Sequence, residues 1–190
     1  MLMTLNDFDG KFFPFCLNAQ RVCRIQKFQE FTNYIGKFFV KPPVLGVVET
    51  WFTSDETGED SKARKPIRLY EIEGYESCFS SRETRSAGIA LYFKKGLSFE
   101  LIDKGNGPVS FIHARLKLVG SECDEDVYFT LIYMPRLDHY SELFNFLERI
   151  LNEIPRGKRH IIMGDFNIDV LKDDSISLAY YYLLLSYFDC

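Results

Sequence analysis

The sequence predicts an α/β fold in which mixed β-sheet is flanked by helices. Three observations predict it. A strand–helix–strand pattern runs from about Phe12 to Val48, several extended segments follow between Gly88 and Tyr133, and a helix–strand pattern runs from Tyr140 to Met163. Alternating helical and extended segments are typical of α/β proteins. The 18 phenylalanines and 11 tyrosines also suit a chain rich in sheet.

Length and composition indicate one soluble globular domain. The 190 residues are 46% hydrophobic and 26% charged, and the chain is long enough to bury a sizeable core. We expect residues 1–11 to form a poorly ordered leader and residues 12–190 to form the domain, as a monomer. The apolar stretch Leu178 to Phe188 is too short to cross a bilayer, so no membrane partner is expected.

Charge and cysteine content narrow the cellular setting. The net charge of −4 gives no general attraction for nucleic acid, so a nucleic-acid site would need a local basic patch or bound cations. The five cysteines are scattered without a CxxC pair, which argues against a zinc site and against a closed disulfide framework. The N-terminal residues make a poor signal peptide because acidic residues come early and no basic segment precedes them. An intracellular, reducing compartment fits best.

The first strand–helix–strand unit delivers a polar residue at each strand end. Phe12 to Leu17 predicts a strand that ends at Asn18, and residues 21–39 predict a helix. The β-branched run Val44 to Val48 predicts a central strand that leads into Glu49. The apolar face of the helix comprises Phe28, Phe31, Ile35 and Phe38 or Phe39. Open α/β sheets place their ligand sites at such strand ends.

The middle of the chain predicts a loop followed by strands. Thr53 to Lys65 is polar and of mixed charge, which is typical of a mobile surface loop. Gly105 to Pro108 and Glu122 to Asp126 are predicted as turns. The predicted strands are Gly88–Phe93, Leu97–Ile102, Val109–Leu118 and Val127–Tyr133.

Two further helices are predicted on either side of a short apolar run. Tyr140 to Asn152 and Ser177 to Tyr187 carry apolar residues at helical spacing. Candidate caps for the second helix are Asp173, Asp174 and Ser175. The run Ile161 to Met163 between them is too short for a helix and predicts a buried strand.

That strand leads into Gly164-Asp165-Phe166-Asn167. Alternate side chains of an extended backbone share one side, so Asp165 and Asn167 are expected to project together, with Phe166 and Ile168 pointing into the core. A carboxylate beside an amide can bind a hard cation, orient a water or hold a phosphate oxygen. An ordinary Asp/Asn turn is the alternative interpretation.

Polar residues end several predicted strands, which suggests a common rim. The set comprises Asn18, Glu49, Tyr133, Asp165 and Asn167. Taken singly, Glu49 fits an exposed carboxylate, Tyr133 a half-buried aromatic and Asn18 a turn or cap residue. It is their combination within one domain that indicates a site.

Together these residues resemble the endonuclease/exonuclease/phosphatase superfamily, which includes abasic-site repair endonucleases and deoxyribonuclease I. The matching segments are Leu17-Asn18, Val48-Glu49-Thr50-Trp51, Tyr133-Met134-Pro135 and Gly164-Asp165-Phe166-Asn167. A finer resemblance, to the endonuclease domain of LINE-like non-LTR retrotransposon polyproteins, lies in Gly74-Tyr75, Arg82 and Ser86 to Tyr92, where the usual glycine run is reduced to Gly88. The resemblance covers the chain from about Phe12 onward and implies a DNase I-like mixed β-sheet sandwich flanked by helices.

The resemblance also implies chemistry. Glu49, Asn18 and Asp165 would hold Mg2+, with Mn2+ as an alternative ion, and Asn18 would orient the metal shell or the phosphate. Asp165 would align or deprotonate the attacking water, while Asn167 and Tyr133 would donate hydrogen bonds to the scissile phosphate. The substrate implied is DNA and the product a nick. Flanking phosphates could contact Arg85, Lys94 or Arg136, although each also fits a solvated surface position.

One departure from the family pattern lies near the end of the chain. Family members finish with further strands and a Ser-Asp-His element, whereas this chain stops at Cys190. His113, His139 and His160 precede the Asp-Asn pair, so none matches that histidine in order. We therefore expect the C-terminal part of the domain to be missing, and the chain alone to be poorly stable and nearly inactive.

Three functions remain open at this point. The first is the DNA-nicking endonuclease of a retrotransposon, nuclear in location and part of a larger polyprotein with reverse transcriptase. The second is a phosphatase or phosphodiesterase of the same fold that acts on a small molecule or lipid headgroup. The third is a catalytically silent remnant.

Overall fold

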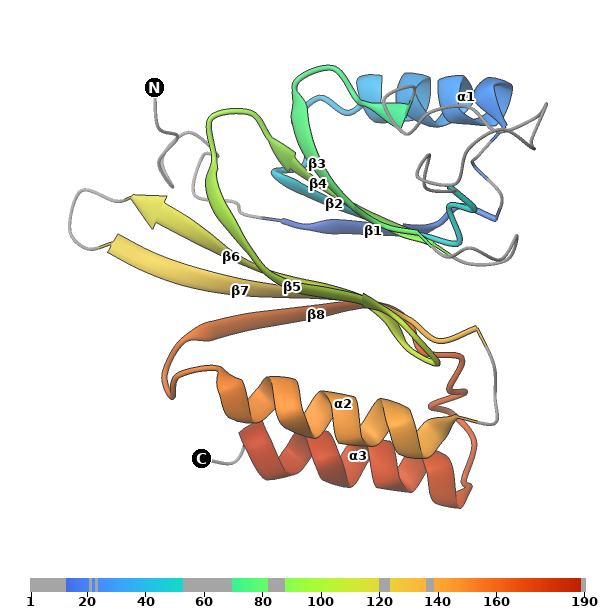
Figure 1. Cartoon of the computed structure of the whole chain (residues 1–190), viewed down its shortest axis with the longest axis vertical. Helices are drawn as coiled ribbons and strands as arrows, with labels where there is room; N and C mark the ends of the chain where they lie inside the picture. Colours follow the sequence, from blue (N-terminus) through green and yellow to red (C-terminus); the bar gives the residue numbers. More distant parts are fainter. Residues whose placement is uncertain are drawn as a thin grey trace.

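The computed structural model describes residues 13–20, 22, 24–52, 70–81, 88–119, 124–135 and 139–188. Figure 1 shows two packed sheets, with α1 outside the first and α2 and α3 outside the second. The prediction of mixed sheets flanked by helices is confirmed. The leader 1–11 and the predicted loop 53–65 lie outside the described residues. The elements are β1 (Phe15–Asn18), α1 (Ile25–Gly36), β2 (Val44–Val48), β3 (Tyr75–Ser80), β4 (Ile89–Lys94), β5 (Ser98–Asn106), β6 (Ser110–Val119), β7 (Asp124–Tyr133), α2 (Tyr140–Glu153), β8 (Arg159–Asp165) and α3 (Ser175–Phe188).

Each sheet contains one parallel strand pair joined by a helix. The sheet orders are β1-β2-β4-β3 and β5-β6-β7-β8. β1 pairs parallel with β2 through the α1 crossover, and β7 pairs parallel with β8 through α2. The other pairs are antiparallel. Asn18 pairs with Val48 and Tyr133 with Asp165, so each parallel pair ends in register.

The apolar core follows the alternation of side chains along the strands. The core between the sheets includes Leu91 from β4 and Phe129 and Leu131 from β7, all fully buried. A second cluster fills the space between the first sheet and α1, and a third lies between the second sheet and α2 with α3. Wherever a strand buries a face in one of these clusters, a slip of one residue would turn its buried side chains to the other face, so the register is strongly specified.

The structure differs from the predicted strands at three elements, β3, β5 and β7. β3 was not predicted, because Tyr75–Ser80 mixes polar and apolar residues without clear alternation. β5 continues to Asn106, through part of the segment predicted as a turn. Gly105 suits the strand there, because a Cβ on it would lie 2.5 Å from the Phe111 ring.

β7 likewise begins within the acidic segment that was predicted as a turn. Its acidic side chains find cationic partners on neighbouring strands. Glu125 Oε1 lies 2.9 Å from Arg159 Nε, and Asp126 Oδ2 lies 3.9 Å from Arg115 Nη1. Ion pairs on neighbouring strands favour extending the ladder into an acidic stretch that would otherwise repel itself.

The helices bear out their predicted positions in most respects. Phe28, Phe31 and Ile35 of α1 are buried, whereas Phe39 lies beyond the helix and is exposed. α3 begins after Asp174, whose Oδ1 accepts hydrogen bonds from the backbone N–H groups of Ile176 (3.1 Å) and Ser177 (2.8 Å). These bonds, chiefly that from Ser177, lower the pKa of Asp174.

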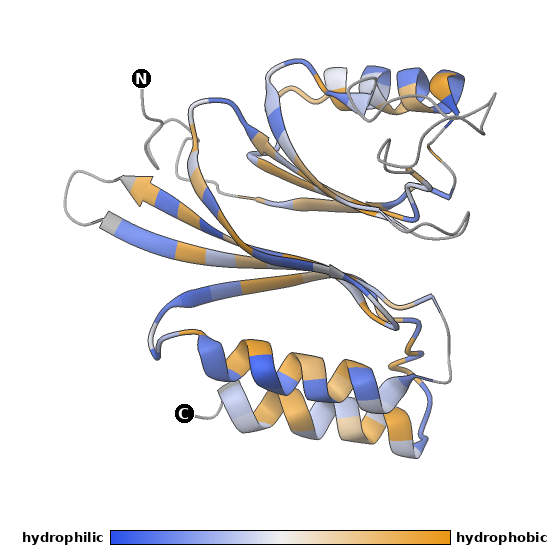
Figure 2. Ribbon diagram, viewed as in Figure 1, coloured by the Kyte–Doolittle hydropathy of each residue, from blue (hydrophilic) through white to orange (hydrophobic). Residues whose placement is uncertain are grey.

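α3 carries hydrophobic residues along its length (Figure 2). Several of them face outward, and the exposed set comprises Leu178, Tyr181, Tyr182 and Leu185. Among the described residues no helix combines the length and apolar character needed to span a membrane.

A buried polar chain lies on the face of the second sheet that α2 covers. His113 Nδ1 and His160 Nε2 each lie 2.8 Å from the hydroxyl of Thr130. Burial lowers the pKa of His113. Burial, with added repulsion from His113, lowers the pKa of His160 to about 3. Both imidazoles are therefore neutral in the folded protein near neutral pH.

These histidines predict loss of stability in weak acid. Their folded-state pKa values lie below the unfolded value of about 6.5, so below that pH the unfolded chain takes up protons that the folded chain does not. Unfolding free energy should be flat above about pH 7 and then fall by up to about 1.4 kcal/mol per pH unit for each such histidine. Urea denaturation across this range measures the slope. His160→Gln should reduce the slope, because it removes one of these two histidines. Equal slopes for wild type and His160→Gln would contradict the assignment.

Candidate functional site

Four polar side chains from four strand ends form one hydrogen-bonded cluster. The side-chain nitrogen of Asn18, at the end of β1, donates to Glu49 Oε1 (3.2 Å) and to Asp165 Oδ2 (2.9 Å). The hydroxyl of Tyr133, at the end of β7, donates to the same Glu49 Oε1 at 3.2 Å. The structure thus brings together Asn18, Glu49, Tyr133 and Asp165, although Asn18 and Asp165 are 147 positions apart in the chain.

Strand alternation explains why these side chains meet. On β8, Ile161 and Met163 pack against the core between the sheets, so Asp165 points to that same side. On β1, Cys16 packs against that core and Asn18 shares its side. The two sheets also lie close together at Gly46 of β2, which brings the strand ends of both sheets near one another. A Cβ on Gly46 would lie only 2.8 Å from Leu131 Cδ1 of β7. The rim of the core between the sheets is therefore lined by polar groups from both sheets.

The backbone around the cluster is strained. Among the described non-glycine residues, positive φ occurs at Gln20 (37°), Glu49 (55°), Trp51 (58°) and Asn167 (51°). All four closely follow the ends of β1, β2 or β8, the strands that end at the cluster. A residue held in this region costs on the order of 1–3 kcal/mol, and such residues concentrate at functional sites. Their position indicates that this rim is shaped for a role other than stability.

Thr50 and Gly88 hold the turn that carries Glu49. Thr50 is fully buried, its backbone N–H donates to Gly88 O at 3.0 Å, and its hydroxyl accepts from the N–H of Phe52 at 3.3 Å. A Cβ on Gly88 would lie 2.8 Å from that hydroxyl, so only glycine fits there without a shift. Both residues belong to segments on which the family resemblance was based. The sequence pattern assigned neither a role, because the pairing of Thr50 with Gly88 beyond the ends of β2 and β4 leaves no local signal.

Asn167 does not continue the extended backbone from Asp165 as predicted. β8 ends at Asp165, and Asn167 adopts a left-handed conformation instead of continuing the strand. Its N–H donates to Asp165 Oδ1 at 3.1 Å, and its side-chain amide donates to the carbonyl of Met134. Phe166 and Ile168 do pack into the core beneath α2 and α3. Asn167 thus joins the ends of β7 and β8 and borders the cluster.

The donor set suits a hard divalent cation. Two carboxylates, Glu49 and Asp165, converge on a single amide nitrogen of Asn18, and their charges repel unless a cation lies nearby. Among the described residues there is no group of three or more His, Cys, Asp or Glu side chains that could hold a metal ion. Mg2+ is commonly bound by one or two carboxylates, with water and substrate oxygens in its other coordination positions. Zinc instead prefers sites built from Cys and His ligands.

Cys16, which precedes Asn18 on the same side of β1, is unsuited to act as a nucleophile. Burial, with added repulsion from Asp165, raises the pKa of its thiol to about 11. The thiol is therefore protonated at neutral pH, and the thiolate is the reactive form. Chemistry at this rim would rest on oxygen and nitrogen groups.

Of the basic residues named as possible phosphate contacts, Lys94 is the one that lies in the described part of the chain. β4 runs antiparallel to β2, and Lys94 pairs with Tyr75 at the end of the sheet opposite Glu49. A role for Lys94 at this site is therefore excluded by topology. Arg82, Arg85 and Arg136 lie outside the described residues. His139 borders α2, where its Nδ1 lies 3.0 Å from Glu142 Oε1, and does not join the cluster.

Comparison with solved structures shows the fold: the chain has the DNase I-like fold that is also found in endonuclease/exonuclease/phosphatase proteins. It resembles the AP endonuclease LMAP from Leishmania major with a TM-score of 0.56 at 16% identity, covering 97% of this chain and 69% of that one. D. rerio TDP2 humanised by 14 mutations is similar with a TM-score of 0.57 at 12% identity, covering 87% of this chain and 68% of that one. The human Nocturnin catalytic domain with bound sulfate is similar with a TM-score of 0.52 at 14% identity, covering 85% of this chain and 66% of that one.

The chain spans about half to two thirds of the length of such structures, from 47% to 69%. No protein-family model matches the sequence. No curated protein matches it either. The likeness is one of fold, at identities of 12% to 16%.

Proposed function

We propose that the chain is a metal-dependent phosphodiester hydrolase. The observation that carries the proposal is the convergence of Glu49 and Asp165 on the amide nitrogen of Asn18, with Tyr133 bonded to the same Glu49 oxygen. Two carboxylates, an amide and a phenol at the carboxyl ends of facing strands can hold a cation, a water and a phosphate together. The DNase I-like fold supports the same chemistry.

Each residue has a distinct role in the proposal. Glu49 and Asp165 would hold Mg2+ or Mn2+ through their carboxylates, and Asn18 would do so through its amide oxygen, which here accepts from the backbone N–H of Gln20 at 3.2 Å. The bound ion would supply Lewis-acid stabilisation of charge on the phosphate and the departing oxygen. The Asp165 carboxylate would orient the attacking water and accept its proton. Tyr133 and Asn167 would donate hydrogen bonds to phosphate oxygens as negative charge builds. In the absence of substrate those two donors are bonded to Glu49 and to Met134 O, so phosphate would have to replace these partners.

DNA is the proposed substrate, and nicking the proposed outcome. D. rerio TDP2 has been solved with a single-strand DNA product, and LMAP is an AP endonuclease. Within this class we propose the endonuclease of a LINE-like retrotransposon polyprotein with reverse transcriptase, which acts in the nucleus. This finer proposal rests on the family resemblance of the sequence.

A nicking assay tests the proposal. Supercoiled plasmid is incubated with the 190-residue chain, and separately with a protein extended by its downstream coding sequence, in Mg2+ and in excess chelator. We expect Mg2+-dependent conversion to the open circle, strongest for the extended protein. A phosphomonoester and a phosphoinositide serve as competing substrates. Hydrolysis of either in preference to DNA would support a phosphatase, and no hydrolysis by either protein would contradict the proposal.

A further inference from the structure

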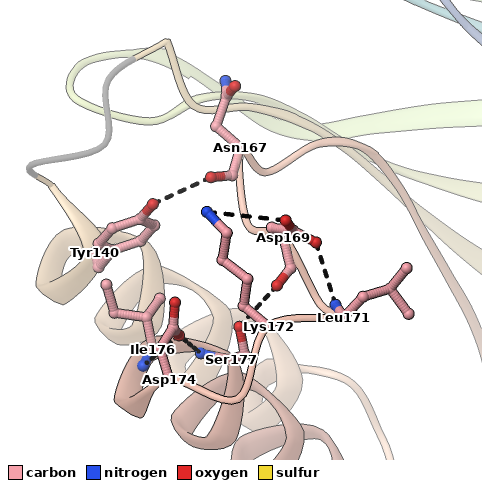
Figure 3. Close-up of polar contacts among 8 residues, drawn as sticks. All are labelled: Tyr140, Asn167, Asp169, Leu171, Lys172, Asp174, Ile176 and Ser177. Atoms are coloured by element: carbon pink, nitrogen blue, oxygen red, sulfur yellow. Dashed lines mark hydrogen bonds and ion pairs between the residues drawn. The ribbon is translucent and has the colours of Figure 1, made fainter.

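A pocket of about 360 Å³ opens beside the cluster, in the loop between β8 and α3 (Figure 3). Its lining includes Tyr140, Asn167, Ile168, Asp169, Lys172 and Ile176. The volume lies at the lower end of the range of small-molecule sites. Neither the sequence nor the fold comparison assigns this pocket a role.

Hydrogen bonds preform its walls. The carbonyl oxygen of Asp169 accepts from Lys172 N–H at 3.0 Å and from the Ser177 hydroxyl at 2.9 Å. The Asp169 carboxylate accepts from Leu171 N–H at 3.3 Å. Across the pocket, the hydroxyl of Tyr140 donates to Asn167 O at 3.1 Å (Figure 3). The loop is thereby tied to both α2 and α3, and a ligand would meet an ordered surface.

The pocket combines apolar walls with one donor beside one acceptor. Tyr140, Ile168 and Ile176 contribute apolar surface. Lys172 Nζ lies 3.8 Å from Asp169 Oδ2, and these side chains are 66% and 54% exposed. An ion pair with this much exposure to solvent is weak, so the ammonium of Lys172 and the carboxylate of Asp169 both remain available to a ligand. A donor next to an acceptor matches the hydrogen-bonding edge of a nucleobase, and an aromatic ring can contact the base face.

The position and charge of the pocket restrict the ligand further. Asn167 borders both the pocket and Asp165, so a ligand with its phosphate at Asp165 can extend into the pocket. Among the described residues that line the pocket, two carboxylates, Asp169 and Asp174, accompany one cation, Lys172, and this balance disfavours a second phosphate there. We infer that the pocket binds the base of an unpaired nucleotide whose phosphate lies at the Asp165 cluster. This inference rests on the proposed function and names the nucleotide class that the site takes.

Two probes isolate the contribution of the base. Thymidine 5′-monophosphate and 2-deoxyribose 5-phosphate share the phosphate and sugar and differ only in the base. With Mg2+ present, their dissociation constants are measured by amide chemical-shift titration of wild type, Lys172→Ala and Lys158→Ala. Lys158 is an exposed lysine just before β8, at the strand end opposite Asp165, and serves as the matched control.

We expect wild type and Lys158→Ala to bind the nucleotide at least about fivefold more tightly than the sugar phosphate, as one stacked and hydrogen-bonded base provides. Lys172→Ala should reduce that preference at least about twofold, because it removes the hydrogen-bond donor and leaves the Tyr140 ring, while its affinity for the sugar phosphate stays within about twofold. Equal weakening of both probes would place Lys172 on the phosphate and overturn the inference, as would equal affinity of wild type for the two probes. If wild type binds neither probe, the proposed phosphate site fails, and the inference fails with it.

Discussion

Replacement of Glu49 by glutamine is expected to lower the rate of phosphodiester hydrolysis at least about a hundredfold, since metal and acid–base contributions are each of that order or larger. Glutamine keeps an oxygen that can accept from Asn18 and from the Tyr133 hydroxyl, the two bonds that Glu49 Oε1 makes. The substitution therefore removes the charge and leaves the hydrogen bonds. Initial nicking rates of the more active of the two proteins in the plasmid assay, with and without the substitution and over a range of Mg2+ concentrations, measure the effect.

The matched control is Glu30→Gln, on the exposed side of α1. It removes the same charge far from the rim and should leave the rate unchanged. Thermal melts should show that neither substitution unfolds the chain. A Glu49→Gln protein that cleaves at the rate of the parent would show that Glu49 does not hold the metal.

Replacement of Gly164 by alanine is expected to destabilise the fold by more than about 3 kcal/mol, because backbone strain and a steric clash act together. Gly164 has a φ of +147°, and a Cβ on it would lie 1.8 Å from Ile132 O and 2.8 Å from Ile132 C. Those atoms belong to β7, which pairs with β8 through this residue, so neither strand can shift without breaking the ladder. Asp165 follows directly and would be displaced from Asn18.

Urea denaturation measures that loss of stability, and Gly36→Ala is its control. Gly36 ends α1 and has no atom within 4 Å of its added Cβ. Alanine there should be neutral or stabilising by up to about 1 kcal/mol, as in helices generally. If Gly164→Ala and Gly36→Ala unfold at the same urea concentration, the close contact with Ile132 O does not constrain the protein.

Local sequence signals predicted the strands that carry the site. Val44–Val48 is a continuous apolar run, and its polar neighbour Glu49 marks the strand end, so β2 was predicted at its observed bounds. The run Ile161–Met163 located β8 for the same reason. β3 was not predicted from the sequence, because Glu76, Ser77 and Ser80 interrupt its apolar pattern. Hydrophobic pattern thus locates a strand when one face or both are plainly buried.

Tertiary details of the site could not be predicted from pattern alone. The bond between Asn18 and Asp165 joins strands of different sheets, and strand order depends on packing that no local window contains. The family resemblance supplied that grouping. It did not supply the left-handed turn at Asn167, which replaces the expected extended backbone. Nor did it indicate the pocket near Lys172, which forms only because α3 packs beside α2.

Titration of the folded chain with Mg2+ tests for a metal site at this rim without requiring turnover. Amide spectra of wild type are recorded during titration with Mg2+, and then with trace Mn2+, whose unpaired electrons broaden nearby signals. We expect saturable shifts and selective broadening at Asn18, Glu49, Asp165 and Asn167, and the loss of both in the Glu49→Gln, Asp165→Asn double variant. Shifts confined to other acidic surfaces, or identical titrations of wild type and the double variant, would contradict a metal site at this rim.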